Sequence, residues 1–321
     1  MLPPEISGTA FLDRRKGARI AAFEGDTMGT RWSVRAVLPE HIEEAAVRVA
    51  INARLDAIIA QMSQWEPASL LSRFNRADVG SWTILPPEFA AVIETGLEIA
   101  RLSNGAFDPA IGRLVDVWGF GPVAIAAEPD DAAINGALAA SGWSRLAWNH
   151  EQRALRQPGG LALDLAGIAK GYAVDAVADL LGELGVRDCL VEIGGELVGR
   201  GVRPDGQPWW VDLEAPGDVA LPSIRVALHG LAVATSGDYR RGAHTFDPRT
   251  GRPVANGVVS VSVIHRTALE ADAWATALTV LGSDKGVALA ASLGIAARII
   301  VAAGRAPREY LTAALEAMIA D

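Results

Sequence analysis

The sequence has a single cysteine and no strongly basic segment. One thiol cannot form a disulfide within the chain or build a cysteine-rich metal site, and the apolar neighbours of Cys189 predict a buried thiol. The net charge is −9, which argues against nucleic acid as the main partner. An anionic ligand would therefore have to be held locally, by helix N-termini, by single Lys or Arg side chains or by a metal ion.

Long apolar runs and a recognisable leader are also absent from the sequence. No run approaches the roughly 18 residues that a membrane-spanning helix needs, so no transmembrane segment is expected. The basic cluster at residues 14–16 precedes an apolar stretch too short for a signal peptide, and no lipobox cysteine lies near the start. We therefore expect a cytoplasmic location by default, or a periplasmic or membrane-associated one if a leader has been removed.

Half of the residues are hydrophobic, which is enough for a large core. Apolar periodicity predicts helices over residues 42–64, 86–102, 130–141, 168–184, 271–281, 285–293 and 307–319. Alternating or β-branched segments predict strands at residues 30–38, 145–148, 154–156, 161–163, 189–193, 197–202, 209–213, 223–228, 231–235, 258–264 and 296–301. These elements come in blocks, so we expect an α+β fold with a mixed or antiparallel sheet packed with helices. Residues 1–20 are expected to form a loosely ordered extension, and residues 21–321 one domain with a ligand cleft between sub-domains.

Residues 164–171 read Asp-Leu-Ala-Gly-Ile-Ala-Lys-Gly and join the predicted strand 161–163 to the helix that follows. Small residues let a ligand approach the main chain, a helix N-terminus attracts anions, and Lys170 adds a positive charge. The segment is neither a Walker A loop nor a Gly-x-Gly-x-x-Gly fingerprint. It predicts either a phosphate-binding corner that begins with Asp164, or a tight turn with a surface lysine.

Asp272 and Thr276 lie four residues apart on a predicted helix, so their oxygen atoms project from one face. A carboxylate and a hydroxyl are part of the oxygen ligand set that Mg²⁺ prefers. The alternative is structural: an aspartate that favours its own helix dipole and a threonine that bonds back into its own helix.

His244 precedes a strong turn signal, Asp247-Pro-Arg-Thr-Gly251. A histidine there is either a general base at neutral pH or a structural residue. Ser236 ends a predicted strand among clustered hydroxyl and charged groups, as binding loops often do.

Two loops combine aromatic residues with polar or glycine residues. One contains Trp65, and the other contains Trp118 and Phe120. Such rings either stack on a flat heterocycle or pack in the core.

Taken in order, these segments resemble the FAD:protein FMN transferases, the ApbE-type flavin transferases. The shared segments are MGTRW, MSQWEPASLLSRFN, GAFDP with GRLVDVWGFG, LDLAGIAKGYAVD, VEIGGE, ATSGDYR, HTFDPRTG and ADAWATAL. The resemblance implies a T-fold-like α+β fold with FAD in a cleft. It implies Mg²⁺-dependent transfer of FMN from FAD to a threonine hydroxyl of a target protein, with release of AMP.

The resemblance also implies roles for individual residues. The implied metal ligands are Asp272, Thr276 and the main-chain carbonyl of Gly167, and the implied catalytic residues are His244, Asp272 and Lys170. The expected FAD contacts are Met28, Trp65, Ala106, Phe107, Asp108, Asp164, Lys170, Ser236 and His244.

The sequence departs from the family pattern in places. Trp65 stands where many relatives carry tyrosine, Thr245-Phe246 replaces two aliphatic residues, and the lipoprotein leader common in the family is not seen. Two other activities fit the same residues. One is hydrolysis of FAD to FMN and AMP, and the other is FAD binding without catalysis.

Overall fold

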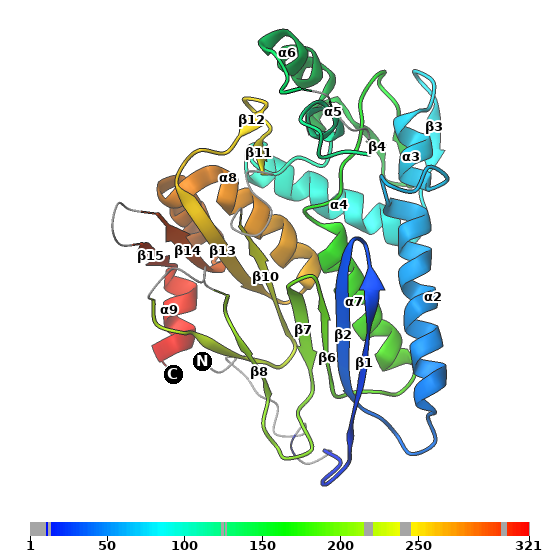
Figure 1. Cartoon of the computed structure of the whole chain (residues 1–321), viewed down its shortest axis with the longest axis vertical. Helices are drawn as coiled ribbons and strands as arrows, with labels where there is room; N and C mark the ends of the chain where they lie inside the picture. Colours follow the sequence, from blue (N-terminus) through cyan, green and yellow to red (C-terminus); the bar gives the residue numbers. More distant parts are fainter. Residues whose placement is uncertain are drawn as a thin grey trace.

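An eight-stranded antiparallel sheet forms the centre of the computed structural model, which describes residues 11, 14–122, 125, 127–214, 221–237, 245–302 and 307–320 (Figure 1). In spatial order its strands are β1 (Ile20–Thr27), β2 (Thr30–Val37), β6 (Cys189–Ile193), β7 (Glu196–Arg200), β10 (Leu231–Ser236), β13 (Val258–His265), β14 (Ala296–Val301) and β15 (Arg308–Leu311). All neighbouring strands pair antiparallel. The α+β class and the antiparallel sheet predicted from the sequence are confirmed.

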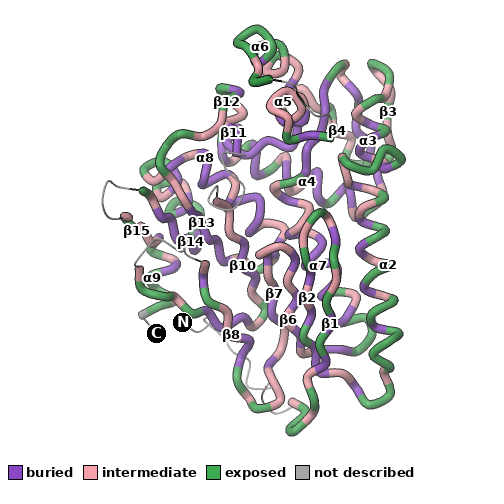
Figure 2. Tube along the Cα trace, in the orientation of Figure 1, coloured by how far each residue is buried: buried purple, intermediate pink, exposed green. Residues whose placement is uncertain are grey.

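Side chains alternate between the two faces of the sheet, and four helices cover the apolar side chains of one face. Val261 and Val263 of β13 point into the larger core, which the helices α2 (Glu44–Met62), α4 (Pro87–Leu102), α7 (Ala169–Glu183) and α8 (Ala268–Leu293) complete. Ile264 points to the other face and packs in a second core with Trp209. There β8 (Trp209–Asp212), β9 (Arg225–Leu228) and α9 (Ala313–Ala320) form the cover. In Figure 2 the central strands are mostly buried and α7 and α8 have many buried residues, while exposed residues recur along α2 and predominate in α6.

Smaller elements lie beyond one end of the sheet, at the top of Figure 1. They are α3 (Leu70–Asn75), β3 (Trp82–Ile84), α5 (Gly112–Val117), α6 (Asp131–Ala140), η1 (Trp143–Arg145), β4 (Ala147–Asn149), β5 (Ala154–Arg156), β11 (Phe246–Asp247) and β12 (Arg252–Pro253). β3, β5 and β4 form a separate three-stranded sheet, and β11 pairs with β12.

Helices α7 and α8 pack closely where α8 begins. The carboxylate of Asp175, on α7, accepts hydrogen bonds from the main-chain amides of Ala268 (3.0 Å) and Leu269 (2.9 Å). Thr267 caps the same helix end through the amide of Glu270. These contacts satisfy amides that have no partner within the helix, so α7 fixes the position of the first turn of α8.

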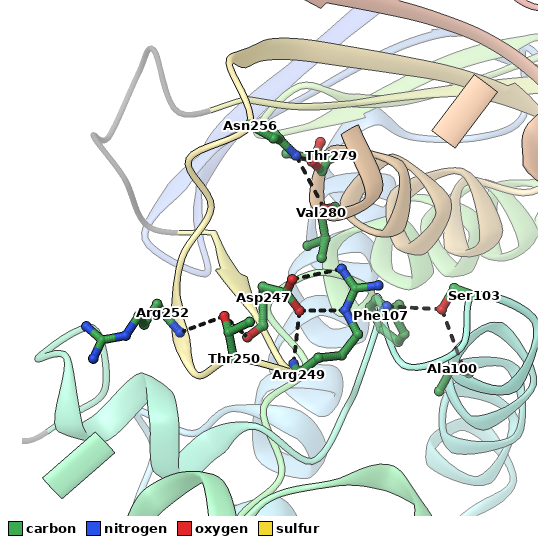
Figure 3. Close-up of polar contacts among 10 residues, drawn as sticks. All are labelled: Ala100, Ser103, Phe107, Asp247, Arg249, Thr250, Arg252, Asn256, Thr279 and Val280. Carbon is green, nitrogen blue, oxygen red and sulfur yellow. Dashed lines mark hydrogen bonds and ion pairs between the residues drawn. The ribbon is translucent and has the colours of Figure 1, made fainter. Parts of the chain in front are cut away.

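Helix α8 is interrupted at Gly282, whose φ of 78° is accessible mainly to glycine. The side-chain amide of Asn256 donates to the carbonyl oxygens of Thr279 (2.9 Å) and Val280 (3.3 Å) beside the break (Figure 3). The predicted pair of helices at residues 271–281 and 285–293 therefore corresponds to one kinked element.

The strand predicted at residues 161–163 is wrong. The main chain of this segment bonds to side-chain amides, whereas a strand would bond to a neighbouring strand. Asn75 exchanges two hydrogen bonds with Leu163 (2.8 and 3.0 Å), and Gln157 donates to the carbonyl oxygen of Leu161 (3.2 Å). The helix predicted at residues 307–319 is partly wrong as well, because its first part is strand β15. Hydrogen bonding to β14 takes precedence there over the helical spacing of apolar residues.

Strand β1 begins at Ile20, near the boundary predicted between an N-terminal extension and the main domain. That division stays a prediction. Within the described ranges, none of the helices is both long enough and apolar enough to cross a membrane.

Candidate functional site

A cavity of about 700 Å³ lies between the end of the large sheet with its helices and the smaller elements beyond it. Its walls come from segments far apart in the sequence. They are the β1–β2 and β6–β7 turns, the loop after α2, residues 106–108, the start of α7, the first turns of α8, the end of β10 and the chain from residue 245 to 248. The cleft expected from the sequence is present.

The start of α7 and the first turns of α8 meet inside this cavity. The main-chain amide of Gly171 donates to Oδ2 of Asp272 at 3.0 Å. A Cβ atom at Gly171 would overlap the carbonyl oxygen of Ala268, and one at Gly167 would lie 2.9 Å from Oγ1 of Thr276. Glycine at both positions therefore permits the close approach. Asp272 thus caps α7, the neighbouring helix. The structural alternative expected from the sequence was an aspartate that interacts with the dipole of its own helix.

Lys170 forms an ion pair with Glu196, which opens β7 directly after the Gly194-Gly195 turn. Glu196 is 2% exposed, and its Oε2 atom has no hydrogen-bond partner among the residues that the structure describes. Burial raises the pKa of the Glu196 and Asp272 carboxyl groups, and the positive charge of Lys170 acts in the opposite direction. Two buried carboxyl groups thus share one nearby lysine in the cavity wall.

Asp164 lies at the turn into α7 and lines the cavity. Its Oδ1 accepts a hydrogen bond from the amide of Ala166 at 2.8 Å, whereas the buried Oδ2 forms no hydrogen bond of good geometry with the described residues. Burial is the main cause that raises the pKa of this carboxyl group, and the side chain of Gln64 lies close enough to act in the opposite direction. A buried oxygen without a well-placed partner is costly, which is typical of an atom that a ligand completes.

The Ala106-Phe107-Asp108 segment forms another wall and is held by its own hydrogen bonds. The amide of Phe107 donates to the hydroxyl of Ser103 at 3.1 Å (Figure 3). Asp108 accepts from the amides of Ala110 (2.8 Å) and Trp143 (3.0 Å), and burial raises its pKa to about 6. Both carboxylate oxygens are thus engaged by the main chain, so Asp108 shapes this wall whatever else it contacts.

Two hairpin tips complete the side of the cavity at the sheet. Met28 and Gly29 have φ values of 49° and 70°, as in the two-residue turns that suit tight hairpins. A Cβ atom at Gly194 would lie 2.9 Å from Thr30, so the β1–β2 and β6–β7 turns touch. This contact places Met28 and Glu196 along the same cavity wall.

Trp65 follows the end of α2 and is 63% exposed at the cavity. Serine side chains fix its loop: the amide of Trp65 donates to Oγ of Ser63 at 3.1 Å, and the hydroxyls of Ser69 and Ser72 donate to the carbonyl of Ser63. The ring is therefore presented on an ordered loop.

The structure brings nearly all predicted site residues to this one cavity. Those that line it are Met28, Trp65, Ala106, Phe107, Asp108, Asp164, Gly167, Lys170, Ser236, Asp272 and Thr276. His244 lies outside the described residues. Sequence reasoning missed Glu196 and the wall position of Phe246. The available signal for Glu196 was its place directly after two glycines in a largely apolar segment. Glutamate is rarely buried without a partner, so a glutamate in such a segment indicates a special role.

The donor set around Asp272 fits a magnesium ion. Among the described residues no group of three or more His, Cys, Asp or Glu side chains gathers as a metal cluster. Mg²⁺ commonly takes only one or two carboxylates from the protein and is completed by water and substrate phosphates. Asp272 offers a buried carboxylate, Thr276 follows one turn later on α8, and the side-chain-free Gly167 lies against Thr276.

Comparison with known proteins gives a consistent result. The model of the ApbE family matches residues 28–299. The FAD:protein FMN transferase of Klebsiella pneumoniae is 36% identical over 305 residues, which cover 90% of this chain and 87% of that protein. The FAD:protein FMN transferase of Vibrio cholerae is 34% identical over 313 residues, which cover 94% of this chain and 93% of that protein.

Solved structures with these names share the fold. The flavinyl transferase ApbE of Pseudomonas stutzeri, in its apo form, has a TM-score of 0.86 and 36% identity over 93% of this chain and 96% of that chain. The flavin transferase ApbE of Vibrio cholerae has a TM-score of 0.86 and 32% identity over 94% of this chain and 99% of that chain.

Proposed function

The chain belongs to the ApbE family, and we propose that it is an enzyme that transfers FMN from FAD to a threonine hydroxyl of a target protein. The observation that carries the proposal is the meeting of two helix starts in one cavity, with Lys170 on one and Asp272 and Thr276 on the other. The names of the related proteins support the same assignment.

In the proposed reaction the threonine oxygen forms a bond to the phosphorus on the FMN side of the FAD diphosphate. The bond from that phosphorus to the bridging oxygen breaks, and AMP leaves with the bridging oxygen and its electron pair. The hydroxyl proton passes to a base, for which His244 is our candidate. Phosphoryl transfer of this kind depends mainly on positioning and on neutralising charge at the phosphate oxygens.

The chain itself offers several groups for this task. The ammonium group of Lys170, in the first turn of α7, would attract the diphosphate together with the positive end of the helix dipole, and the ion pair with Glu196 holds Lys170 at the cavity wall. Asp272, Thr276 and the carbonyl of Gly167 would hold Mg²⁺, which when bound supplies positive charge to the phosphate oxygens. Met28, Trp65, the segment from Ala106 to Asp108, Asp164 and Ser236 would contact the rest of FAD.

Oδ2 of Asp164, which forms no hydrogen bond of good geometry with the described residues, would accept a hydrogen bond from the bound dinucleotide. Because Oδ1 is already engaged by Ala166, the direction of the remaining oxygen is fixed before the ligand arrives. The location of the protein in the cell and the acceptor threonine of its target stay predictions.

Incubation of the protein with FAD, Mg²⁺ and a threonine-containing acceptor peptide tests the proposal. We expect covalent flavin on the peptide and stoichiometric AMP, detected by mass spectrometry and chromatography, and no product when EDTA is added. A peptide with alanine in place of the threonine is the matched control. Free FMN with AMP and no labelled peptide would show hydrolysis instead, and unchanged FAD would show binding alone.

A further inference from the structure

Phe120 is an exposed aromatic side chain in the wall of the cavity. Its side chain is 40% exposed, although large aromatic rings are usually well covered in folded proteins. Among the Trp and Phe side chains that the structure describes, only Trp65, Trp82 and Phe120 are exposed, and two of these three line the cavity. The cavity therefore presents a second open ring besides that of Trp65.

The main chain on both sides of Phe120 is tightly constrained. Gly119 has a φ of 78°, and a Cβ atom there would lie 2.5 Å from Ile125. A Cβ atom at Gly121 would overlap the carboxylate of Asp116. The amide of Phe120 donates to the carbonyl oxygen of Val115 at 3.0 Å. The main chain that carries the ring is thus held in place by its neighbours.

Two further rings support Phe120 from behind. Phe246 meets it edge-on, with ring centroids 5.6 Å apart and planes at 64°. Phe246 also stacks on Trp118 at 5.8 Å, and the indole N–H of Trp118 donates to the carbonyl oxygen of Gly251 at 2.9 Å. Phe246 is 4% exposed, so it serves as backing while Phe120 keeps its open surface.

The β11–β12 turn that carries Phe246 is itself braced by ion pairs. Asp247 pairs with Arg249 within the turn at 2.7 Å (Figure 3). Arg252 pairs with Asp131 of α6 at 2.5 Å. The three rings are therefore preorganised, and a ligand that uses them loses little conformational entropy in ordering them.

We propose that Phe120, backed by Phe246 and Trp118, stacks on one of the two flat ring systems of FAD, the isoalloxazine or the adenine. The inference rests on the proposed function and deepens it, because it assigns a ring-binding residue in a wall separate from Trp65. A planar heteroaromatic ring covers the open surface of Phe120 without displacing its backing. Stacking of a base on an aromatic side chain corresponds to a loss of roughly 5- to 150-fold in affinity on substitution by alanine.

Calorimetric titration of the full chain with FAD, FMN and AMP, each without acceptor, tests this assignment. We expect Phe120→Ala to weaken FAD binding by at least about 5-fold and to weaken either FMN or AMP by a similar factor while leaving the other unchanged. The affected half identifies the ring. Phe120→Tyr, which keeps the ring, should retain the wild-type affinities. Trp82→Ala is the matched control, because Trp82 is exposed but does not line the cavity.

Unchanged affinity of Phe120→Ala for all three ligands would overturn the inference. Equal weakening of FMN and AMP together with a lowered melting temperature would also overturn it, because Phe120 would then only support the wall. A wild-type protein that does not bind FAD at all would reject the proposed function, and the inference with it.

Discussion

Gly171 shows how one missing side chain determines the geometry of the site. A methyl group there would overlap the carbonyl oxygen of Ala268 and lie 2.8 Å from Cβ of Asp272. Both neighbours belong to α8, so the absence of a Cβ atom lets the two helices touch where Asp272 accepts the Gly171 amide. Gly171 belongs to a sequence motif of small residues, and from the sequence alone these residues are explained by the close approach of a ligand. Helix–helix contact is a second reason for them, and local pattern alone does not reveal it.

Gly171→Ala should lower the free energy of unfolding by about 2 kcal/mol, since the main chain of α8 must move to accept the methyl group. Gly182→Ala in the same helix is the matched control. A Cβ atom there meets only the end of Arg200 at 3.8 Å, so this change should be neutral or stabilise by up to about 1 kcal/mol. Urea unfolding monitored by circular dichroism measures both values. Equal stability of the two variants would contradict this account of the contact.

Asp108 should make stability depend on pH. Burial raises its pKa to about 6 in the folded chain, so the folded chain binds the proton more tightly than the unfolded chain does. The resulting stabilisation is fully present below the unfolded pKa of about 4 and is lost as the pH rises towards 6, by at most about 1.4 kcal/mol per pH unit.

Asp108→Asn removes this titrating group, so position 108 should no longer contribute to the pH dependence of stability. It also leaves the Trp143 amide without one acceptor oxygen, which costs stability at every pH. We therefore expect the difference in unfolding free energy between wild type and Asp108→Asn to be larger at pH 4 than at pH 6.5. Urea unfolding at the two pH values measures it, and a difference independent of pH would refute the assignment.

Among the secondary-structure elements, those with strong periodicity were predictable and those that depend on tertiary pairing were not. The apolar spacing of α4 and α7 and the β-branched run of β13 matched the structure closely. The pairing of β15 with β14 and the side-chain bonds of Asn75 to residue 163 involve partners distant in sequence. No local pattern contains that information, which is why the strand predicted at 161–163 and the start of the last helix were wrong.

Besides its own cap Thr267, helix α8 has two of its first amides bonded to Asp175 of α7, so Asp175→Ala should lower the unfolding free energy by about 1–2 kcal/mol. The carboxylate of Asp175 accepts two amide hydrogen bonds that alanine cannot replace. Asp179, one turn further along α7, forms an ion pair with Arg200 in which its own side chain is exposed. Asp179→Ala should therefore change stability by less than about 0.5 kcal/mol. Thermal and urea unfolding of both variants provide the measurement, and equal losses would count against a capping role.

At the scale of the whole molecule, the site exists because hairpin tips, loops and helix starts from across the chain converge on one cavity. The sequence supplied the residue types and their order, and the described site residues that it predicted line the cavity, while their roles stay predictions. It did not supply the distances between them. The ion pair of Lys170 with Glu196 and the backing of Phe120 by Phe246 follow from tertiary packing, since each joins segments separated by long stretches of chain.

The most direct measurement is the rate of FMN transfer by Asp272→Ala as a function of Mg²⁺ concentration, beside wild type and Asp284→Ala. Asp284 is an exposed residue of the same helix and serves as the control. We predict that Asp272→Ala folds, as judged by circular dichroism, but transfers FMN at least about 100-fold more slowly and no longer responds to Mg²⁺, while Asp284→Ala behaves as wild type. A folded Asp272→Ala protein with the wild-type rate and magnesium response would contradict the central claim.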